Sequence, residues 1–442
     1  MTVLTDAYSA LRHHRYAKRF PDVIALAVVA LIAAMVAVRL FNGQTIVLGR
    51  ETIVRDLPMW TYLGERLHSL ELPAWNPFQF GGIPFAADPA SGWMYLPVVI
   101  LFALFSVTKA TAALLVAHFA IAGIGIFIFA RVIGIERPAA ATAGIAFISS
   151  NWFYTASFSD PTQVAVASWL PWALLFTELA IRPETLFRRI AFTGLAAASF
   201  SQILGIWYGN GAFYAVILLV AWLAYRTLVE TWGDEIGLQR HLIDLAIVLA
   251  GVIVWTVGLG AAGLFPRALA EKTSQFSLPI VDFSGWNLGK ALTGDGAASP
   301  GDVVIYLAII GAFVAGRKFC NPFFIGAVIL AFLVETDQFM VVGSLPIAIL
   351  AGIGVTMLIT KPVPDRQGVI AIGAMVVVFL ATLFSANHMT ETERMVEFAL
   401  VVALSALILA RDMSSWRYLL IAFALLFHAT MLLDRVDLLK YG

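Results

Sequence analysis

Residues 110–130 read ATAALLVAHFAIAGIGIFIFA and contain no Asp, Glu, Lys or Arg. An α-helix of this length rises about 30 Å, which matches the hydrocarbon thickness of a bilayer. The apolar runs 24–38 and 216–223 also lack the alternation of polar and apolar residues that marks membrane β-strands. These stretches predict an all-α, polytopic membrane protein.

The composition of the whole chain agrees with a membrane location. Of 442 residues, 60% are hydrophobic and 13% are charged, whereas soluble domains carry roughly 25% charged residues. The formal net charge is zero, so no global field favours a nucleic-acid partner. The single cysteine, Cys320, excludes an internal disulfide and a cysteine-based metal cluster.

Apolar blocks recur along the chain and predict about 13 transmembrane helices in a single transmembrane domain, 1–442. The blocks are 22–41, 110–130, 139–156, 162–180, 190–207, 211–225, 242–265, 302–316, 322–334, 341–360, 368–386, 396–410 and 417–433. Two external loops result, 42–108 and 266–301. We expect the chemistry there, because loops on a rigid scaffold carry function.

Basic residues between the blocks set the expected orientation. By the positive-inside rule, pairs such as Arg188/Arg189 and Arg317/Lys318 predict a cytoplasmic N-terminus, with the chain in the inner (plasma) membrane. The aromatic-rich stretch 93–107 would turn these pairs outward if it crossed. We therefore expect interfacial helices in the first external loop.

The first external loop carries a series of short motifs. From residue 50 to residue 97 it reads RETIVRDLPMWTYLGERLHSLELPAWNPFQFGGIPFAADPASGWMYLP. Its marks are Asp56, LPAWNP at 72–77, GGIP at 81–84 and YLP at 95–97. In this order they resemble the loop of YfhO-like bacterial membrane proteins, of the GT-C superfamily of polyprenyl-phosphate-sugar-dependent glycosyltransferases. WLPW at 169–172, with Glu178, extends the resemblance, which covers about three-quarters of the chain.

This resemblance implies transfer of a sugar from a polyprenyl-phosphate-linked donor to an envelope glycan, lipid or protein at the outer face. In the superfamily an acidic residue just after the first span serves as general base or metal ligand. Here that residue is Asp56, so a divalent metal is a candidate cofactor. A carboxylate near the membrane surface can take a proton from an acceptor hydroxyl while the lipid phosphate leaves. Alternatively, Asp56 pairs with Arg55 or Arg66 and only fixes the loop.

Basic residues of the external loops are candidates for binding the donor phosphate. A phosphate must be held and its charge stabilised as it leaves. We assign Arg55, Arg66, Arg267 and Lys272 to this role. The competing interpretation is that basic side chains at span ends extend to lipid headgroups.

Further candidates for substrate binding lie in the first loop. Trp75, with Trp93 and Tyr95, suits a platform for sugar stacking, although Trp and Tyr are enriched at membrane interfaces in any case. Asn76 belongs to the same motif as Trp75 and is assigned to the substrate site with it. Asp88 is a further candidate.

Two aspartates precede prolines, which favours an extended or capping geometry. They are Asp88 and Asp160, and capping is the preferred interpretation for Asp160, which is expected on the same face as Asp56. The family's Gly-His near Asp160 and its Gly-His-Pro near 209–211 are missing from this sequence. This departure weakens any mechanism that needs those histidines.

Two other functional classes remain open at this level. A lipid-linked-sugar flippase would also need many helices, but most spans lack a central charged residue, which pathways usually carry. A non-catalytic membrane subunit, with a partner chain, is the second alternative. His118, inside an apolar block, is expected to hydrogen-bond to a neighbouring helix.

Overall fold

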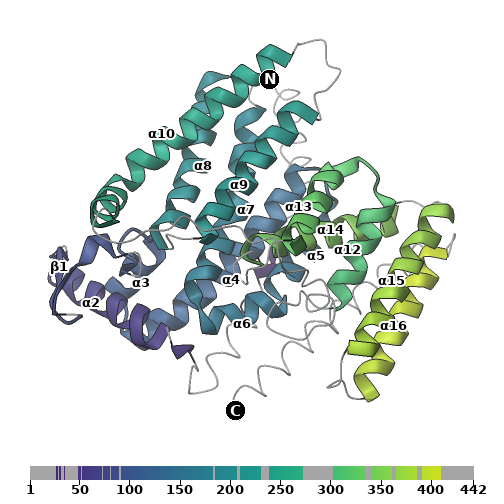
Figure 1. Cartoon of the computed structure of the whole chain (residues 1–442), viewed down its shortest axis with the longest axis horizontal. Helices are drawn as coiled ribbons and strands as arrows, with labels where there is room; N and C mark the ends of the chain where they lie inside the picture. The colour runs from purple at the N-terminus through teal and green to yellow at the C-terminus, as the bar shows by residue number, and fades with distance from the viewer. Residues whose placement is uncertain are drawn as a thin grey trace, which may run out of the picture.

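The computed structural model describes residues 48–50, 52–71, 73–79, 81–88, 91–182, 185–206, 210–229, 238–271, 302–333, 340–360, 365–385 and 391–409, and a few residues between 26 and 34. Fourteen α-helices make up most of this part of the chain (Figure 1). They are α2 (Leu57–His68), α3 (Leu96–Leu104), α4 (Val107–Val132), α5 (Arg137–Ile148), α6 (Asn151–Ser159), α7 (Pro161–Ile181), α8 (Leu186–Ile206), α9 (Asn210–Ala224), α10 (Leu238–Glu271), α12 (Asp302–Val314), α13 (Asn321–Leu333), α14 (Met340–Thr360), α15 (Asp365–Ser385) and α16 (Glu391–Leu409).

The helices confirm the prediction of an all-α, multi-pass membrane protein. By length and composition, five of them can cross a bilayer: α4, α7, α8, Leu242–Arg267 within α10, and Val341–Thr360 within α14. Five shorter apolar helices accompany them in the described residues. The predicted block 417–433 and most of 22–41 lie outside those residues, and the total of 13 spans stays a prediction.

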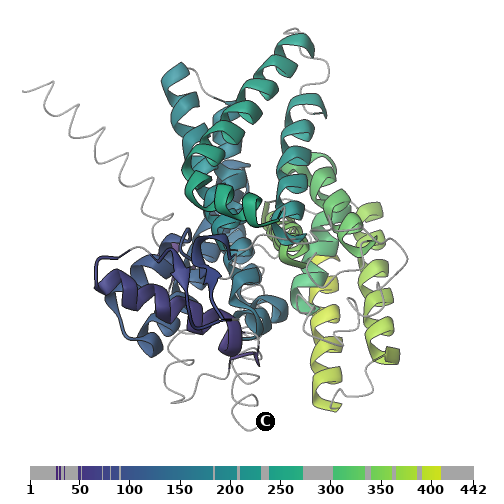
Figure 2. The same ribbon diagram turned by 60° about the vertical axis from the view of Figure 1, so that its left-hand side comes forward.

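The helix α14 lies at the centre of the bundle, packed against α5, α12 and α13. Gly311 of α12 and Gly354 of α14 let these two backbones approach closely. A Cβ atom at either glycine would overlap a backbone carbonyl of the facing helix. Figure 2 shows the pair α15 and α16 on the side of the bundle away from the first loop.

The first loop is a compact unit. It contains α2, a short antiparallel pair of strands, β1 (Trp75–Asn76) and β2 (Ile83–Pro84), and α3. The rings of Trp60 and Phe102 meet edge to face with centroids 5.7 Å apart and join α2 to α3. With nine residues, α3 rises only about 14 Å. A helix of this length is too short to cross about 30 Å of hydrocarbon, and the interfacial placement of the stretch 93–107 stays a prediction.

Two predicted blocks differ from the observed helices. The block 139–156 is two helices, α5 and α6, because Ser150 takes an extended conformation and its hydroxyl accepts a hydrogen bond from Phe153 N at 3.2 Å. This cap starts a new helix. The block 242–265 continues through Pro266 to Glu271, so the segment 266–301 begins as helix. Proline is tolerated in membrane helices when neighbouring groups satisfy the backbone.

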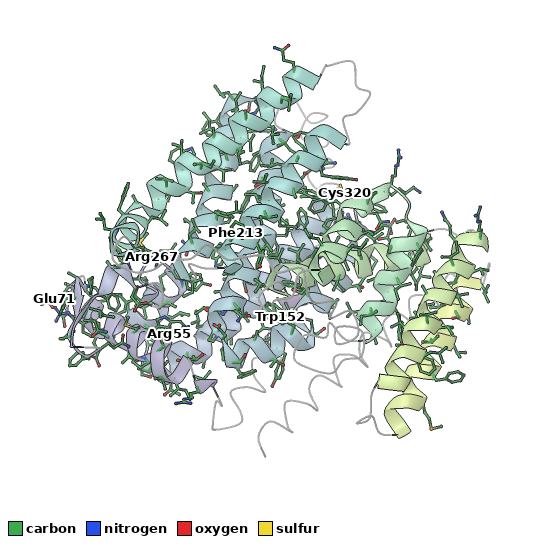
Figure 3. The ribbon with its side chains drawn as sticks, viewed as in Figure 1. Arg55, Glu71, Trp152, Phe213, Arg267 and Cys320 are labelled. Carbon is green, nitrogen blue, oxygen red and sulfur yellow. The ribbon has the colours of Figure 1, made fainter. Side chains whose placement is uncertain are left out.

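The bundle has two ends, which we call the loop face and the opposite face. The loop face carries the first loop, the start of α7 and the end of α8, whereas the opposite face carries the end of α7 and Cys320. Figure 3 places Arg55 and Arg267 toward the loop face and Cys320 toward the opposite face.

Candidate functional site

The carboxylate of Asp56 is buried and paired with its neighbour Arg55. Arg55 Nε donates to Oδ1 at 2.8 Å and Nη2 donates to Oδ2 at 3.5 Å. The Asp56 side chain is 1% exposed, but the Arg55 side chain is 47% exposed. One edge of the guanidinium therefore contacts the carboxylate, while about half of the arginine stays accessible at the protein surface.

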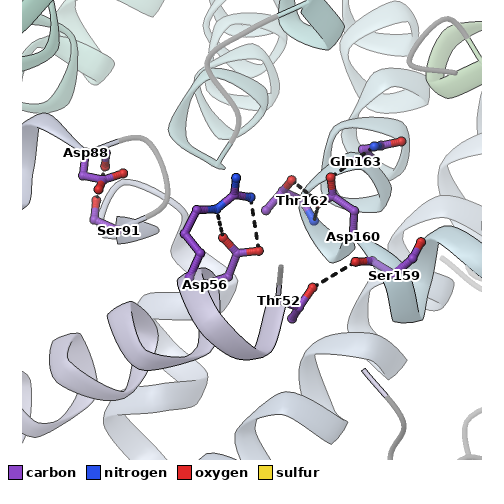
Figure 4. Close-up of polar contacts among 9 residues, drawn as sticks. Thr52, Asp56, Asp88, Ser91, Ser159, Asp160, Thr162 and Gln163 are labelled. Carbon is purple, nitrogen blue, oxygen red and sulfur yellow. Dashed lines mark hydrogen bonds and ion pairs between the residues drawn. The ribbon is translucent and has the colours of Figure 1, made fainter. Parts of the chain in front are cut away.

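The helical turn that ends at Asp56 is fixed against the end of α6. This turn is π-helical and spans Thr52–Asp56, directly before α2. Gly49 N donates to Phe158 O at 2.7 Å, and Thr52 Oγ1 donates to Ser159 O at 3.1 Å. A Cβ atom at Gly49 would overlap the Ser159 carbonyl, so the approach requires glycine. These bonds bring the segment before Asp56 to the residue that precedes Asp160 (Figure 4).

The side chain of Asp160 caps the helix α7. Its Oδ1 accepts from Thr162 N at 3.1 Å, and its Oδ2 accepts from Gln163 Nε2 at 3.1 Å. This confirms the capping interpretation of the sequence. Asp56 and Asp160 both lie at the loop face, on segments that contact each other.

The side chain of Arg66 lies at the far end of α2. Ten residues of helix separate it from Asp56, a rise of about 15 Å. Arg66 instead pairs with Glu71, with 2.6 Å between Nη2 and the carboxylate, and its guanidinium lies 6.0 Å from the Tyr62 ring. Of the two pairings that the sequence left open, Asp56–Arg55 is therefore present and Asp56–Arg66 is wrong. Arg66 belongs to a second group of residues, around the strands β1 and β2.

The residues Trp75 and Asn76 form this second group with Arg66. Asn76 is buried, and its Oδ1 accepts from Phe78 N at 3.0 Å, which closes the turn after β1. Trp75 is half exposed, and its ring lies so close to Gly82 that a Cβ atom there would come within 2.6 Å. Asn76 thus serves the fold of the loop, and Trp75 presents an open aromatic face.

The backbone at Asp88 is extended, as expected before a proline. Its carbonyl accepts from Ser91 N at 3.1 Å and from Ser91 Oγ at 2.7 Å, which closes a turn. In Figure 4, Asp88 and Ser91 lie on one side of Asp56, and Asp160 lies on the other.

The guanidinium of Arg267 is buried at the end of α8. Its Nη1 donates to Leu204 O at 2.6 Å and its Nη2 donates to Gly205 O at 3.1 Å. The last carbonyls of a helix attract cations in this way. Lys272 lies outside the described residues.

A buried hydrogen-bond network ties the first loop to the bundle. The Tyr95 hydroxyl lies 2.9 Å from His118 Nε2 and accepts from Trp169 Nε1 at 3.2 Å. Burial raises the pKa of Tyr95, with the Trp169 hydrogen bond opposing the rise, so the phenol stays neutral. His118 therefore bonds as expected, but its partner comes from the loop. Tyr95 is fully buried and forms no part of a surface platform.

An ion-pair cluster that the sequence analysis did not identify lies at the opposite face. Glu178 is fully buried, and both its carboxylate oxygens accept from Arg226, at 2.8 and 3.0 Å. Arg182, directly after the end of α7 and four residues after Glu178, also pairs with Glu178. Arg226 Nη1 lies 3.6 Å from Cys320 Sγ.

The described residues contain no group of three or more His, Cys, Asp or Glu side chains that could hold a metal ion. Asp56 and Asp160 are already bonded to protein donors. The divalent metal therefore remains a prediction, with Asp56 as its candidate ligand.

Solved structures share this arrangement of helices. ArnT from Cupriavidus metallidurans in the apo state matches with a TM-score of 0.55 and 17% identity, over 95% of this chain and 77% of that one. The same enzyme bound to undecaprenyl phosphate matches with a TM-score of 0.54 and 14% identity over the same shares. The chain has a GT-C fold.

A larger protein also contains this arrangement of helices. The arabinofuranosyltransferase AftD from Mycobacteria matches with a TM-score of 0.52 and 16% identity, over 86% of this chain and 27% of that one. The sequence itself matches no protein-family model and no curated protein. At these identities the likeness establishes the fold.

Proposed function

We propose that this protein is a GT-C glycosyltransferase, akin to the YfhO-like proteins, that moves a sugar from a polyprenyl-phosphate-linked donor to an envelope acceptor. The observation that carries the proposal is the Arg55–Asp56 pair at the loop face of a GT-C fold. Undecaprenyl phosphate in ArnT supports a lipid-linked donor. The reaction would take place at the outer face of the inner membrane.

The pair joins the two chemical functions that the transfer needs. Asp56 is the general base, which takes the proton of the acceptor hydroxyl as that oxygen attacks the anomeric carbon. Arg55 keeps its carboxylate contact with one edge and offers its exposed side to the departing phosphate. As the C–O bond to the phosphate breaks, a guanidinium stabilises the charge that develops on the leaving group.

The test is the substitution Asp56→Asn, with transfer of labelled sugar into envelope material measured at equal protein level. Loss of a general base lowers rates by roughly a hundred- to ten-thousand-fold. The amide is nearly isosteric, and the arginine left behind is half exposed, so we expect the variant to fold. Glu71→Gln is the matched control, because it removes a carboxylate of the same loop that pairs with Arg66.

Near-normal transfer by the Asp56→Asn protein would remove this residue from the mechanism. If the wild-type protein transfers no sugar from any lipid-linked donor, the proposal is wrong as a whole. The non-catalytic subunit and the flippase are the functions that would then be tested.

A further inference from the structure

The outer end of the first loop carries two large aromatic side chains that are open to solvent. In β1 the Trp75 side chain faces outward, whereas Asn76 is buried. Trp75 is 52% exposed, and Phe78, in the turn that follows, is 81% exposed. Burial of such rings is favourable, and clustered exposed apolar groups mark interaction sites. We call Trp75 and Phe78 the outer platform.

The surrounding residues hold the outer platform in place. Gly82 fits along the edge of the Trp75 indole that carries Nε1 and Cζ2, where an added Cβ atom would come within 2.6 Å of both atoms. The Tyr62 hydroxyl donates to Trp75 O at 2.8 Å, and the Tyr62 ring meets Phe78 edge to face with centroids 5.8 Å apart. An edge contact leaves a face of the indole open. Because the rings are already ordered, binding of a ligand loses less conformational entropy.

A cation borders the outer platform. The Arg66 guanidinium lies 6.0 Å from the Tyr62 ring, the same ring that Phe78 contacts. Glu71 pairs with Arg66 Nη2 at 2.6 Å and orients the guanidinium, while the Arg66 side chain stays 43% exposed. A guanidinium has several N–H donors. Arg66 can therefore donate hydrogen bonds to a ligand that lies on the rings.

A sugar ring matches this combination of groups. One face of a pyranose presents C–H groups, which pack against an aromatic ring, and its rim presents hydroxyls, whose oxygens accept from a guanidinium. A lipid chain would match the rings alone. It would also take Arg66 and Glu71 out of water without replacing their hydrogen bonds to water, which is costly. The outer platform therefore favours a carbohydrate over a lipid.

The outer platform is remote from the Arg55–Asp56 pair. Arg66 lies ten residues beyond Asp56 along α2, a rise of about 15 Å. In Figure 3, Glu71 lies at the outer edge of the first loop and Arg55 lies nearer to the bundle. A sugar unit on the platform therefore cannot be the unit whose hydroxyl reacts at Asp56. The two units belong to one acceptor only if that acceptor is a chain of several sugars.

We propose that Trp75, Phe78 and Arg66 form a subsite that binds a remote sugar unit of an oligosaccharide or polysaccharide acceptor. The inference rests on the proposed function, which requires an envelope acceptor and leaves glycan, lipid and protein open. It selects the glycan. It also assigns Arg66 to sugar hydroxyls instead of the donor phosphate.

The experiment titrates the purified full chain, in lipid nanodiscs, with chitohexaose and with maltohexaose, and follows binding by saturation-transfer NMR. These probes are pyranose chains of different linkage. Trp75→Leu removes the flat ring but keeps an apolar side chain. The affinity should fall at least about tenfold, because a ring that covers one face of a sugar buries enough apolar area for that change. Trp75→Tyr keeps a flat ring and should bind within about threefold of wild type.

The matched control is Trp255→Leu on α10. Trp255 is 47% exposed, similar to Trp75, but it lies in a helix that can cross the bilayer. This variant should bind the hexasaccharides within about twofold of wild type. Asp56→Asn should also bind them normally, because the platform is remote from that carboxylate.

A further variant distinguishes a sugar from the membrane as the partner of the platform. Trp75→Cys in nanodiscs should react with a water-soluble maleimide, because the side chain at position 75 faces water. The wild-type protein gives the background, since Cys320 is buried. A thiol at position 75 that stays unlabelled would place the platform in lipid, and the sugar assignment would be wrong.

The remaining outcomes separate the subsite from the proposed function. Wild-type affinity in Trp75→Leu, or no hexasaccharide binding by the wild-type protein, would overturn the subsite even if sugar transfer occurs. Binding that depends on Trp75, without sugar transfer from any lipid-linked donor, would leave the subsite in place and the proposed function wrong. Where transfer occurs, Trp75→Leu should raise the acceptor KM and leave kcat unchanged, as expected for a residue that only binds.

Discussion

Two buried carboxylates, at opposite ends of the bundle, are held in different ways. Asp56 at the loop face takes its guanidinium from the preceding residue, inside one helical turn. Glu178 at the opposite face takes one from Arg182, four residues later, and another from Arg226, 48 residues away. Glu178 therefore ties α7 to the segment after α9, whereas Asp56 and Arg55 are neighbours in the sequence.

Burial and ion pairing are common to both carboxylates, so neither property separates the structural role expected for Glu178 from the chemical role proposed for Asp56. The distance along the chain between the partners is more informative. Removing Glu178 would leave Arg226, with its side chain 15% exposed, next to Cys320 in the interior. Removing the charge of Asp56 would leave Arg55 half exposed. We therefore expect Glu178 to govern stability and Asp56 to govern activity.

The largest effect that this comparison predicts is a loss of stability in the Glu178→Gln variant. Because breaking a buried ion pair leaves an uncompensated charge, the free energy of unfolding should fall by about 3–5 kcal/mol. Reversible unfolding in detergent micelles measures this, with sugar transfer per folded molecule as the second readout. A loss below about 1 kcal/mol, as expected for an exposed pair, would show that Glu178 does not hold α7 in place.

A smaller effect is expected where the first loop meets the bundle. Tyr95→Phe removes the hydroxyl shared by His118 and Trp169 and leaves their buried polar groups without it. Leaving a buried polar group without its partner lowers the free energy of unfolding by about 1–3 kcal/mol. Tyr62→Phe is the control, because that hydroxyl donates to Trp75 O at 2.8 Å in an exposed position. Equal losses in the two variants, in thermal unfolding of the purified proteins, would contradict a special role for the buried network.

The smallest predicted effect concerns Asp160 and tests whether this residue takes part in the reaction together with Asp56. Asp160→Ala should lower stability by about 1 kcal/mol, because it removes the cap of α7, whereas Asp160→Asn keeps a capping oxygen and should be near wild type. Chemical unfolding compares the two proteins, and sugar transfer is measured in parallel. An Asp160→Asn protein that is stable but inactive would place both carboxylates in the reaction.

Much of the fold could be predicted because hydropathy reports directly on what a bilayer accepts. The blocks at α4, α7 and α8 correspond closely to single helices. The block 139–156 does not correspond to a single helix. Its break was not predicted because Ser149 and Ser150 could also be accommodated inside a membrane helix. Only the local conformation of Ser150, whose hydroxyl caps α6, reveals the break.

The site was predictable where the contacts are local and not where they are long-range. The pair of Arg55 with Asp56 and the cap by Asp160 follow from residue type and sequence neighbours. Glu178 has one local partner, Arg182, four residues later. Its second partner, Arg226, and the partner of His118, Tyr95, are 48 and 23 residues away, and no local pattern identifies these two. Arg267 was assigned to phosphate binding because it follows an apolar block. The carbonyls that it contacts belong to another helix, 62 and 63 residues earlier in the sequence.

The packing of Met94 makes the position of the first loop depend on a glycine of α8. Its carbonyl lies against Gly205 of α8 and its side chain against Gly263 of α10, where a Cβ atom would in each case come within 2.6 Å. A side chain at Gly205 must displace the Met94 backbone and with it the first loop, to which Asp56 and Arg55 belong, whereas at Gly263 the Met94 side chain can rotate away. A substitution at Gly205, far from both residues in the sequence, would thus shift the proposed Arg55–Asp56 site without changing either of its residues.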